Sequence, residues 1–124
     1  MYLWLMLILM TGIQATALAS EADVIDVKVA RTGPDTYSFA VTVRHADTGW
    51  DHYADKWEVL GPDGTVLATR ELMHPHVDEQ PFTRTLDGVH LAPTVKRVRV
   101  RAHDKVHEFG GLEREVDLPQ APQN

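Results

Sequence analysis

Between Val24 and Leu118, apolar and polar side chains alternate with a period of two almost throughout. Successive side chains of an extended strand point to opposite faces, so this period is typical of strands that bury one face, and not of helices. In the clearest run, Tyr37 to Val43, every second residue is aromatic or aliphatic. The pattern therefore predicts an all-β chain.

Seven strands are expected, separated by turns rich in Gly, Pro and Asp. The strongest turn signal is Gly61-Pro62-Asp63-Gly64, which separates a strand containing Trp57 and Val59 from its return strand. Seven short strands at regular spacing predict a seven-stranded antiparallel sandwich like that of immunoglobulin and fibronectin type III domains, with Trp57 in the core. The expected strands occupy the ranges 25–29, 37–44, 57–59, 65–72, 82–86, 97–102 and 116–118.

The first 19 residues carry no charged side chain. An apolar run from Leu3 to Met10 is followed by small residues ending in Ala17-Leu18-Ala19, which is the pattern of a secretory signal peptide. The segment is short for a membrane-spanning helix, and an uncleaved anchor is the alternative. No cysteine follows the small residues, so no lipoprotein anchor is expected. We expect a signal peptide at 1–19, a β-sandwich domain at 20–118, a flexible C-terminal tail at 119–124, and a periplasmic or secreted location.

The chain carries 12 basic and 18 acidic side chains, a net charge of −6, and no cysteine. Net acidity argues against nucleic acid and against an anionic membrane surface as partners. The absence of cysteine excludes a disulfide framework, a thiolate metal site and a thiol nucleophile. The expected partner is therefore a metal ion or another exported protein, with no membrane contact after signal cleavage.

Two features of the charge pattern need an explanation. The arginines at alternate positions of 97–101 either form an anion-binding stripe or pair across strands with Glu113, Glu115 and Asp117, which have the same period. The ion-pair ladder is favoured, because exposed pairs of this kind are common and energetically weak. Arg84 occupies an otherwise inward-facing position, so we expect it at a sheet edge or paired with a carboxylate.

The expected topology brings six of the seven histidines to one end of the sandwich. Consecutive strands run in opposite directions, so the loops 45–55, 73–81 and 103–111 lie at the same end, and His90 lies at the other. The six histidines are His45, His52, His74, His76, His103 and His107.

Converging histidines predict a metal site, because neutral imidazole is the commonest ligand for divalent transition metals where thiolates are absent. In His74-Pro75-His76, extended backbone directs both imidazoles to the same side. His103 and His107 are expected to face each other across a hairpin. We expect the principal ligands to be His74, His76 and His107.

The metal predicted by this ligand set is copper or zinc, with nickel as a further option, since the donors are imidazoles with carboxylates nearby. The carboxylates of the same loops are expected to complete the coordination sphere or to hold the second ring nitrogen of a ligand, and Asp55, Glu79 and Asp104 are selected from them as site residues. The full set is Asp47, Asp51, Asp55, Asp78, Glu79, Asp104 and Glu108. The plainer interpretation is that each histidine is a hydrogen-bonding surface residue, because most histidines in proteins bind no metal.

The same loops carry three aromatic residues, Trp50, Tyr53 and Phe109. Beside a metal they would shield the site from water, and they would also serve simply to cap the core. The alternative function is a non-catalytic recognition module that binds a protein or a carbohydrate through these aromatic loops. No nucleophile motif is present, so we expect no catalytic residues and no enzyme, with a metal-activated water as the remaining route to hydrolysis.

Three segments resemble a family of small uncharacterised exported bacterial proteins. The segments are His45-x-x-x-Gly49-Trp50-x-x-Tyr53-Ala54-Asp55-x-Trp57, His74-Pro75-His76-x-x-Glu79-Gln80-Pro81-Phe82-Thr83-Arg84 and Arg101-Ala102-x-Asp104-x-Val106-His107-x-x-Gly110-Gly111. The resemblance covers nearly all of the chain after the signal segment. It implies an exported location and a β-sandwich fold, but no activity.

Overall fold

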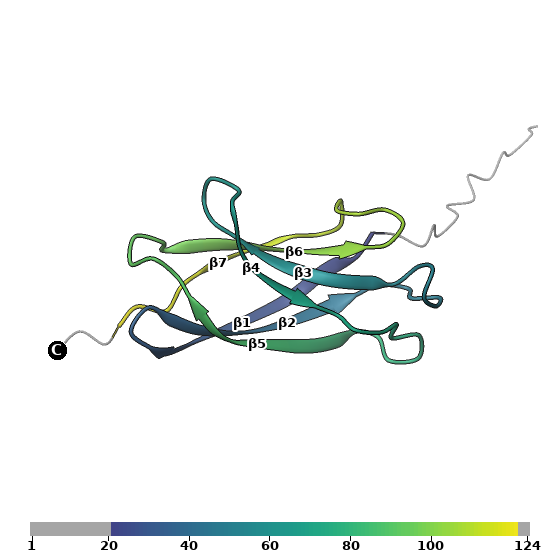
Figure 1. Ribbon diagram of the computed structural model, residues 1–124, viewed down its shortest axis with the longest axis horizontal. Helices are drawn as coiled ribbons and strands as arrows, with labels where there is room; N and C mark the ends of the chain where they lie inside the picture. The colour runs from purple at the N-terminus through teal and green to yellow at the C-terminus, as the bar shows by residue number, and fades with distance from the viewer. Residues whose placement is uncertain (1–20, 122–124) are drawn as a thin grey trace, which may run out of the picture.

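The computed structural model describes residues 21–121, which form two antiparallel β-sheets packed face to face (Figure 1). One sheet has the strand order β1-β2-β5 and the other β4-β3-β6-β7. The predicted all-β sandwich of seven strands is confirmed, whereas the predicted signal peptide at 1–19 lies outside the described residues. The strands are β1 (Asp23–Gly33), β2 (Thr36–Arg44), β3 (Ala54–Leu60), β4 (Val66–Glu71), β5 (Phe82–His90), β6 (Arg97–Asp104) and β7 (Arg114–Asp117). Residues 21–121 contain no helix that could cross a membrane.

The core lies between the two sheets and follows the alternation of the sequence. On β2, the residues at every second position from Tyr37 to Val43 are buried, while their neighbours face outward. Trp57 of β3 is fully buried together with Phe39 and Phe82 of the opposite sheet. Burial of this apolar surface is the main stabilising contribution in a chain that has no disulfide.

β1 departs from the expected pattern at its start. The pairing with β2 shifts between Val24 and Asp26, which is a β-bulge. An extra residue in one strand reverses the faces on either side of it. Val24 is consequently fully buried and Ile25 only partly, while Val27 and Val29 return to the inward face.

The charged residues singled out in the sequence find partners. Arg97 and Arg99 of β6 reach the β7 carboxylates, with Arg97 Nε 2.7 Å from Asp117 Oδ1, so the expected ladder is present. Arg101 departs from it and pairs with Glu58 of β3 at 2.9 Å. Arg84 lies on β5, at the edge of the three-stranded sheet, and its partner is an imidazole and not a carboxylate.

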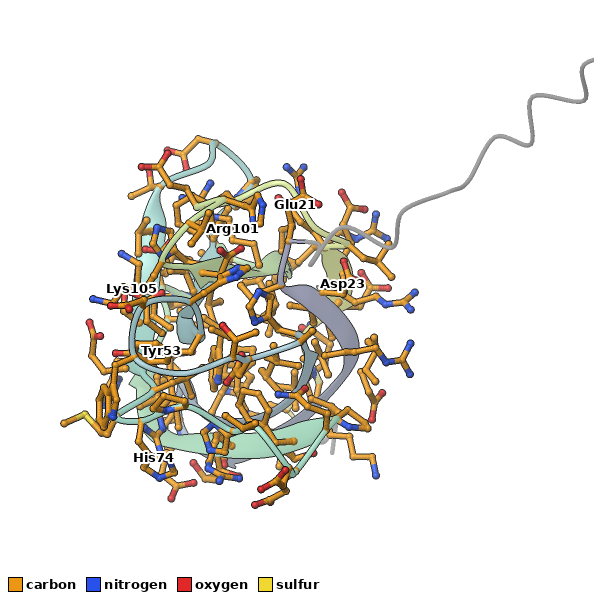
Figure 2. All side chains as sticks on the ribbon, turned by 90° about the vertical axis from the view of Figure 1, so that its right-hand side faces the viewer. Glu21, Asp23, Tyr53, His74, Arg101 and Lys105 are labelled. Carbon is orange, nitrogen blue, oxygen red and sulfur yellow. The ribbon has the colours of Figure 1, made fainter. Side chains whose placement is uncertain are left out.

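Three loops lie at the same end of the sandwich, on the right in Figure 1. They are the β2–β3 loop (45–53), the β4–β5 loop (72–81) and the β6–β7 loop (105–113), and we call this end the histidine pole. Figure 2 looks onto this end and shows Glu21, the first described residue, there as well. The chain described by the structure ends at the opposite end of the sandwich (Figure 1). His90 also lies there, with its Nε2 3.4 Å from the Thr36 hydroxyl at the start of β2.

Candidate metal centre

Asp104, the last residue of β6, is fully buried at the histidine pole. Its Oδ1 accepts hydrogen bonds from the backbone N–H groups of Val106 at 2.9 Å and His107 at 2.7 Å. These bonds shape the turn, which is closed by a backbone bridge between Asp104 and Glu108. Oδ2 of Asp104 is buried and accepts no hydrogen bond. One carboxylate oxygen is therefore held by the backbone, and the other is free to bind a ligand.

His45 follows the last residue of β2 and is 1 % exposed. Its Nδ1 lies 2.5 Å from Oδ1 of Asp47, so we assign the ring proton to Nδ1, which donates to that carboxylate. In the neutral ring, Nε2 keeps its lone pair. It lies 3.2 Å from Nε2 of His52 and 3.9 Å from Oδ2 of Asp104. His45 therefore presents Nε2 to both His52 and Asp104.

Asp47 holds three segments of the chain together. Besides the His45 ring, it accepts hydrogen bonds from the backbone N–H groups of Ala54 at 3.0 Å and His76 at 2.7 Å. These donors belong to the β2–β3 loop, the start of β3 and the β4–β5 loop. Asp47 thus fixes the position of the His45 ring within the pole.

The two buried carboxylates stay ionised. Burial works to raise the pKa of Asp47, but the His45 ring and the N–H groups of His76 and Ala54 outweigh it and hold the pKa below its ordinary value. Burial likewise works to raise the pKa of Asp104, and the N–H groups of His107 and Val106, with the nearby His45, outweigh it. The pole therefore concentrates two negative charges out of water, and a cation placed between them would be stabilised.

His52 is brought in by a short turn within the β2–β3 loop. The backbone N–H of Thr48 donates to the His52 carbonyl at 3.0 Å, and the N–H of His52 donates to the Gly49 carbonyl at 3.2 Å. Gly49 has a φ of 151°, a conformation that glycine adopts readily and other residues rarely do. The turn places Nε2 of His52 3.2 Å from Oδ1 of Asp104.

One ligand atom from each of His45, His52 and Asp104 lies within 4.8 Å of the other two. A tetrahedral ion with bonds of about 2.0–2.1 Å separates its ligand atoms by about 3.3 Å. The measured separations of 3.2 Å and 3.9 Å from His45 Nε2 lie on either side of that value. Two imidazoles and one carboxylate suit divalent transition metals, and the geometry needs only small shifts to hold one.

His107 lies beside this group, on the side open to solvent. Its Nδ1 is 3.3 Å from Oδ1 of Asp104 and has no hydrogen-bond partner, although the atom itself is buried. Its ring centroid is 5.1 Å from that of His52, and 33 % of its side chain is exposed.

The structure places His74 and His76 on the other side of Asp47. The His76 ring stacks on Phe82, with centroids 4.0 Å apart, and its Nε2 accepts a hydrogen bond from Arg84 at 2.8 Å. Burial, followed by the charges of Arg84 and His74, lowers the pKa of His76. His74 is exposed and packs on His76. Neither ring belongs to the group of His45, His52 and Asp104. The backbone of His76 is linked to His45 through Asp47 and through the Gln80 side chain.

His103 does not face His107. Side chains alternate along β6, so His103 lies on the outer face of its sheet while Asp104 lies on the inner face. There its Nδ1 pairs with Asp55 at 2.6 Å, and its ring meets the edge of Phe109. Asp55 therefore holds an imidazole as expected, but one outside the cluster.

The remaining predicted residues are dispersed over the pole. Trp50 is 67 % exposed and rests edge-on against the buried Tyr53, with ring centroids 5.7 Å apart. Arg101 covers Phe109 at 3.7 Å from the ring centroid. Glu79 is exposed. Figure 2 looks onto the pole and shows Tyr53, His74 and Arg101 well separated.

Sequence reasoning placed Asp47 among the carboxylates able to hold the second ring nitrogen of a ligand, but did not select it as a site residue. The available signal was the spacing His45-x-Asp47 at the end of a strand, where extended backbone directs both side chains to one side. Asp104 was expected in a supporting role or as a completing ligand, and it lies at ligand distance from two histidines.

Comparison with known proteins gives one relative. A protein of Halomicrobium mukohataei described as "Putative lipoprotein" is 40% identical over 97 residues. The alignment covers 78% of this chain and 47% of that protein, so the chain spans about half the length of its relative. No family model and no solved structure matches the chain.

Proposed function

We propose that this chain is an exported, non-catalytic protein that binds one divalent transition-metal ion, Cu(II) or Zn(II), through His45, His52 and Asp104. One observation carries the proposal. His45 and Asp104 are both buried, each has one polar atom held by the protein, and their free atoms, Nε2 and Oδ2, lie 3.9 Å apart. Nε2 of His52 lies 3.2 Å from His45 Nε2 and 3.2 Å from the other oxygen of Asp104, Oδ1.

Asp47 supports this assignment. Metal-binding histidines usually donate their other ring N–H to a carboxylate, which fixes the tautomer and raises the basicity of the ligating nitrogen. The 2.5 Å contact between His45 Nδ1 and Asp47 is of this kind. Because Asp47 is itself held by two backbone N–H groups, the His45 ring is oriented before any metal arrives.

Export is supported by two observations. The first 19 residues follow the signal-peptide pattern, and the relative from Halomicrobium mukohataei is described as a lipoprotein. The 124 residues contain no cysteine, so lipid attachment through a cysteine is not available within them.

Calorimetric titration of the purified, untagged protein with Cu(II) and Zn(II) tests the metal site. We expect one ion per chain with Kd below about 1 μM. Asp104→Asn keeps the oxygen that the backbone holds but removes the charge, and His45→Ala removes a ligand. Either change is expected to weaken binding by about 100-fold or more.

The matched control is His103→Ala, which removes an imidazole of the same pole that lies outside the cluster. Its affinity should equal that of the wild type. Equal loss in the control and in the site variants, or no stoichiometric binding by the wild type, would refute the metal site. The His45, His52 and Asp104 group would then be a hydrogen-bonded network.

The second candidate function is recognition of a protein or carbohydrate partner at the same pole. The observation in its favour is the exposure of apolar side chains on the three loops there, led by Trp50 at 67 % and Met73 at 73 %. An aromatic platform is less supported, because Tyr53 is buried and Phe109 is covered by Arg101. Partner binding that is lost in Trp50→Ala and insensitive to a chelator would favour this function.

A further inference from the structure

The proposed metal site is closed on one side and open on the other. His45 and Asp104 are 1 % and 0 % exposed and form its floor. The side chain of His52 is 14 % exposed and that of His107 is 33 % exposed. A metal held by His45, His52 and Asp104 would therefore be reached from the side on which His107 lies.

A tetrahedral ion takes four ligands, so three protein ligands leave one coordination position unfilled. His107 is the imidazole placed to fill it, because its Nδ1 is 3.3 Å from Asp104 Oδ1 and its ring is 5.1 Å from that of His52. That Nδ1 is buried without a hydrogen-bond partner. A buried polar atom without a partner is costly, so it points to an interaction that the protein makes with a ligand.

His107 differs from His45 in how its ring is held. Asp47 fixes the His45 ring through a 2.5 Å hydrogen bond, whereas within residues 21–121 no hydrogen bond holds Nδ1 of the His107 ring. The backbone N–H of His107 is bonded to Asp104, so the residue stays beside the site although no hydrogen bond to Nδ1 fixes its ring. Because 33 % of the His107 side chain is exposed, the ring can be reached from solvent.

We propose that His107 is the fourth, exchangeable ligand of the metal. The position it takes is where an imidazole from outside, in the cell a histidine side chain of a metal-accepting protein, enters the coordination sphere. In the exchange, a nitrogen of the incoming neutral imidazole replaces a nitrogen of neutral His107, and neither the charge nor the oxidation state of the metal changes. This inference rests on the proposed metal site at His45, His52 and Asp104.

The test uses the Cu(II)-loaded protein and free imidazole as the probe. In the wild type, imidazole should shift the visible absorption band and change the nitrogen hyperfine pattern in electron paramagnetic resonance, while copper stays bound through gel filtration. His107→Ala should still bind one Cu(II) per chain, with affinity reduced by about 10–100-fold. It should take up imidazole at lower concentration than the wild type, because the position is already open.

The His103→Ala variant is the matched control and should behave as the wild type. Thermal unfolding of each metal-free variant checks that it folds, and His107→Gln replaces His107→Ala if the alanine variant does not. Unchanged copper affinity and an unchanged imidazole response in His107→Ala would overturn the role of His107 and leave the three-ligand site standing. Failure of the wild type to bind copper would overturn both.

Discussion

Carboxylates meet basic side chains in two regions of this molecule, and burial makes the two regions different in kind. On the outer face of β6 and β7, Arg97 and Arg99 are 61 % and 50 % exposed and form a ladder with carboxylates of β7. At the histidine pole, the side chains of Asp47 and Asp104 are 0 % exposed and meet imidazoles.

Water and salt weaken the ladder, because solvated charges interact through a high dielectric constant. The buried carboxylates lack that solvation, so each must be compensated by donors that the fold supplies. Asp47 receives three donors, and Asp104 has one oxygen that receives two and another that receives none. Charge pairing on the ladder is solvated and weak, whereas at the pole the fold must supply the compensating donors and leaves one oxygen of Asp104 without any.

Removing Asp47 should give the largest effect on stability. Asp47→Ala leaves the ring N–H of His45 and the backbone N–H groups of Ala54 and His76 without an acceptor. We expect a loss of about 3–5 kcal/mol in the free energy of unfolding. Urea denaturation at pH 7 measures it. Asp117→Ala, which removes a carboxylate from the ladder, is the matched control and should leave the midpoint unchanged. Equal urea midpoints for Asp47→Ala and Asp117→Ala would show that the buried and the exposed carboxylates contribute equally to stability, which contradicts the comparison.

The histidine pole should also make the free energy of unfolding depend on pH between 7.5 and 5. The ladder should not contribute in this range, because it contains only arginines and carboxylates. The folded pKa of His76 is lowered, so between its ordinary value of about 6.5 and the folded value the unfolded chain binds a proton that the folded chain refuses. This contribution to stability is complete above about pH 6.5 and is lost as the pH falls towards the folded pKa.

Denaturation midpoints of the wild type and of His76→Gln, measured from pH 7.5 to 5, check this. Glutamine offers an oxygen to Arg84 in place of Nε2 and does not titrate. The midpoint should fall less steeply with acidification in the variant than in the wild type. Identical slopes would mean that His76 titrates normally in the fold.

Salt should give the smallest effect. Raising NaCl from 0.05 to 0.5 M screens exposed charges over a shorter distance, from about 14 Å to about 4 Å. Any change in unfolding midpoint that Arg97→Ala causes at low salt should therefore vanish at high salt, whereas the deficit of Asp47→Ala should persist. A deficit of Asp47→Ala that disappears with salt would show that its charge is accessible to solvent.

Local pattern was sufficient for most of the fold. The alternation from Tyr37 to Val43 predicted the inward face of β2. In a strand with one buried face, the apolar positions determine which side chains point into the core. The pattern failed at Val24 and Ile25, since a bulge depends on the partner strand and leaves no mark in the alternation itself. Arg84 was readable as an edge residue, but its partner comes from a loop whose path the pattern does not determine.

For the site, topology predicted which loops meet, but not which atoms. His103 and His107 are four residues apart, yet one lies on the outer face of a strand and the other in the following turn. The positioning role of Asp47 follows from its three hydrogen-bond donors, which come from separate segments of the chain. Such convergence depends on side-chain direction at loop positions, which spacing in the sequence does not determine.

The opposite placement of the two ends of the described chain governs how the protein should be handled in the laboratory. Glu21 lies at the histidine pole (Figure 2), while Ala121 lies beside the β1–β2 turn at the far end. A polyhistidine tag fused ahead of Glu21 would add competing imidazoles next to the site and distort any titration. Immobilisation through the C-terminus instead presents the pole outward, so a sensor surface prepared that way would leave the histidines open to metal and to a docking partner.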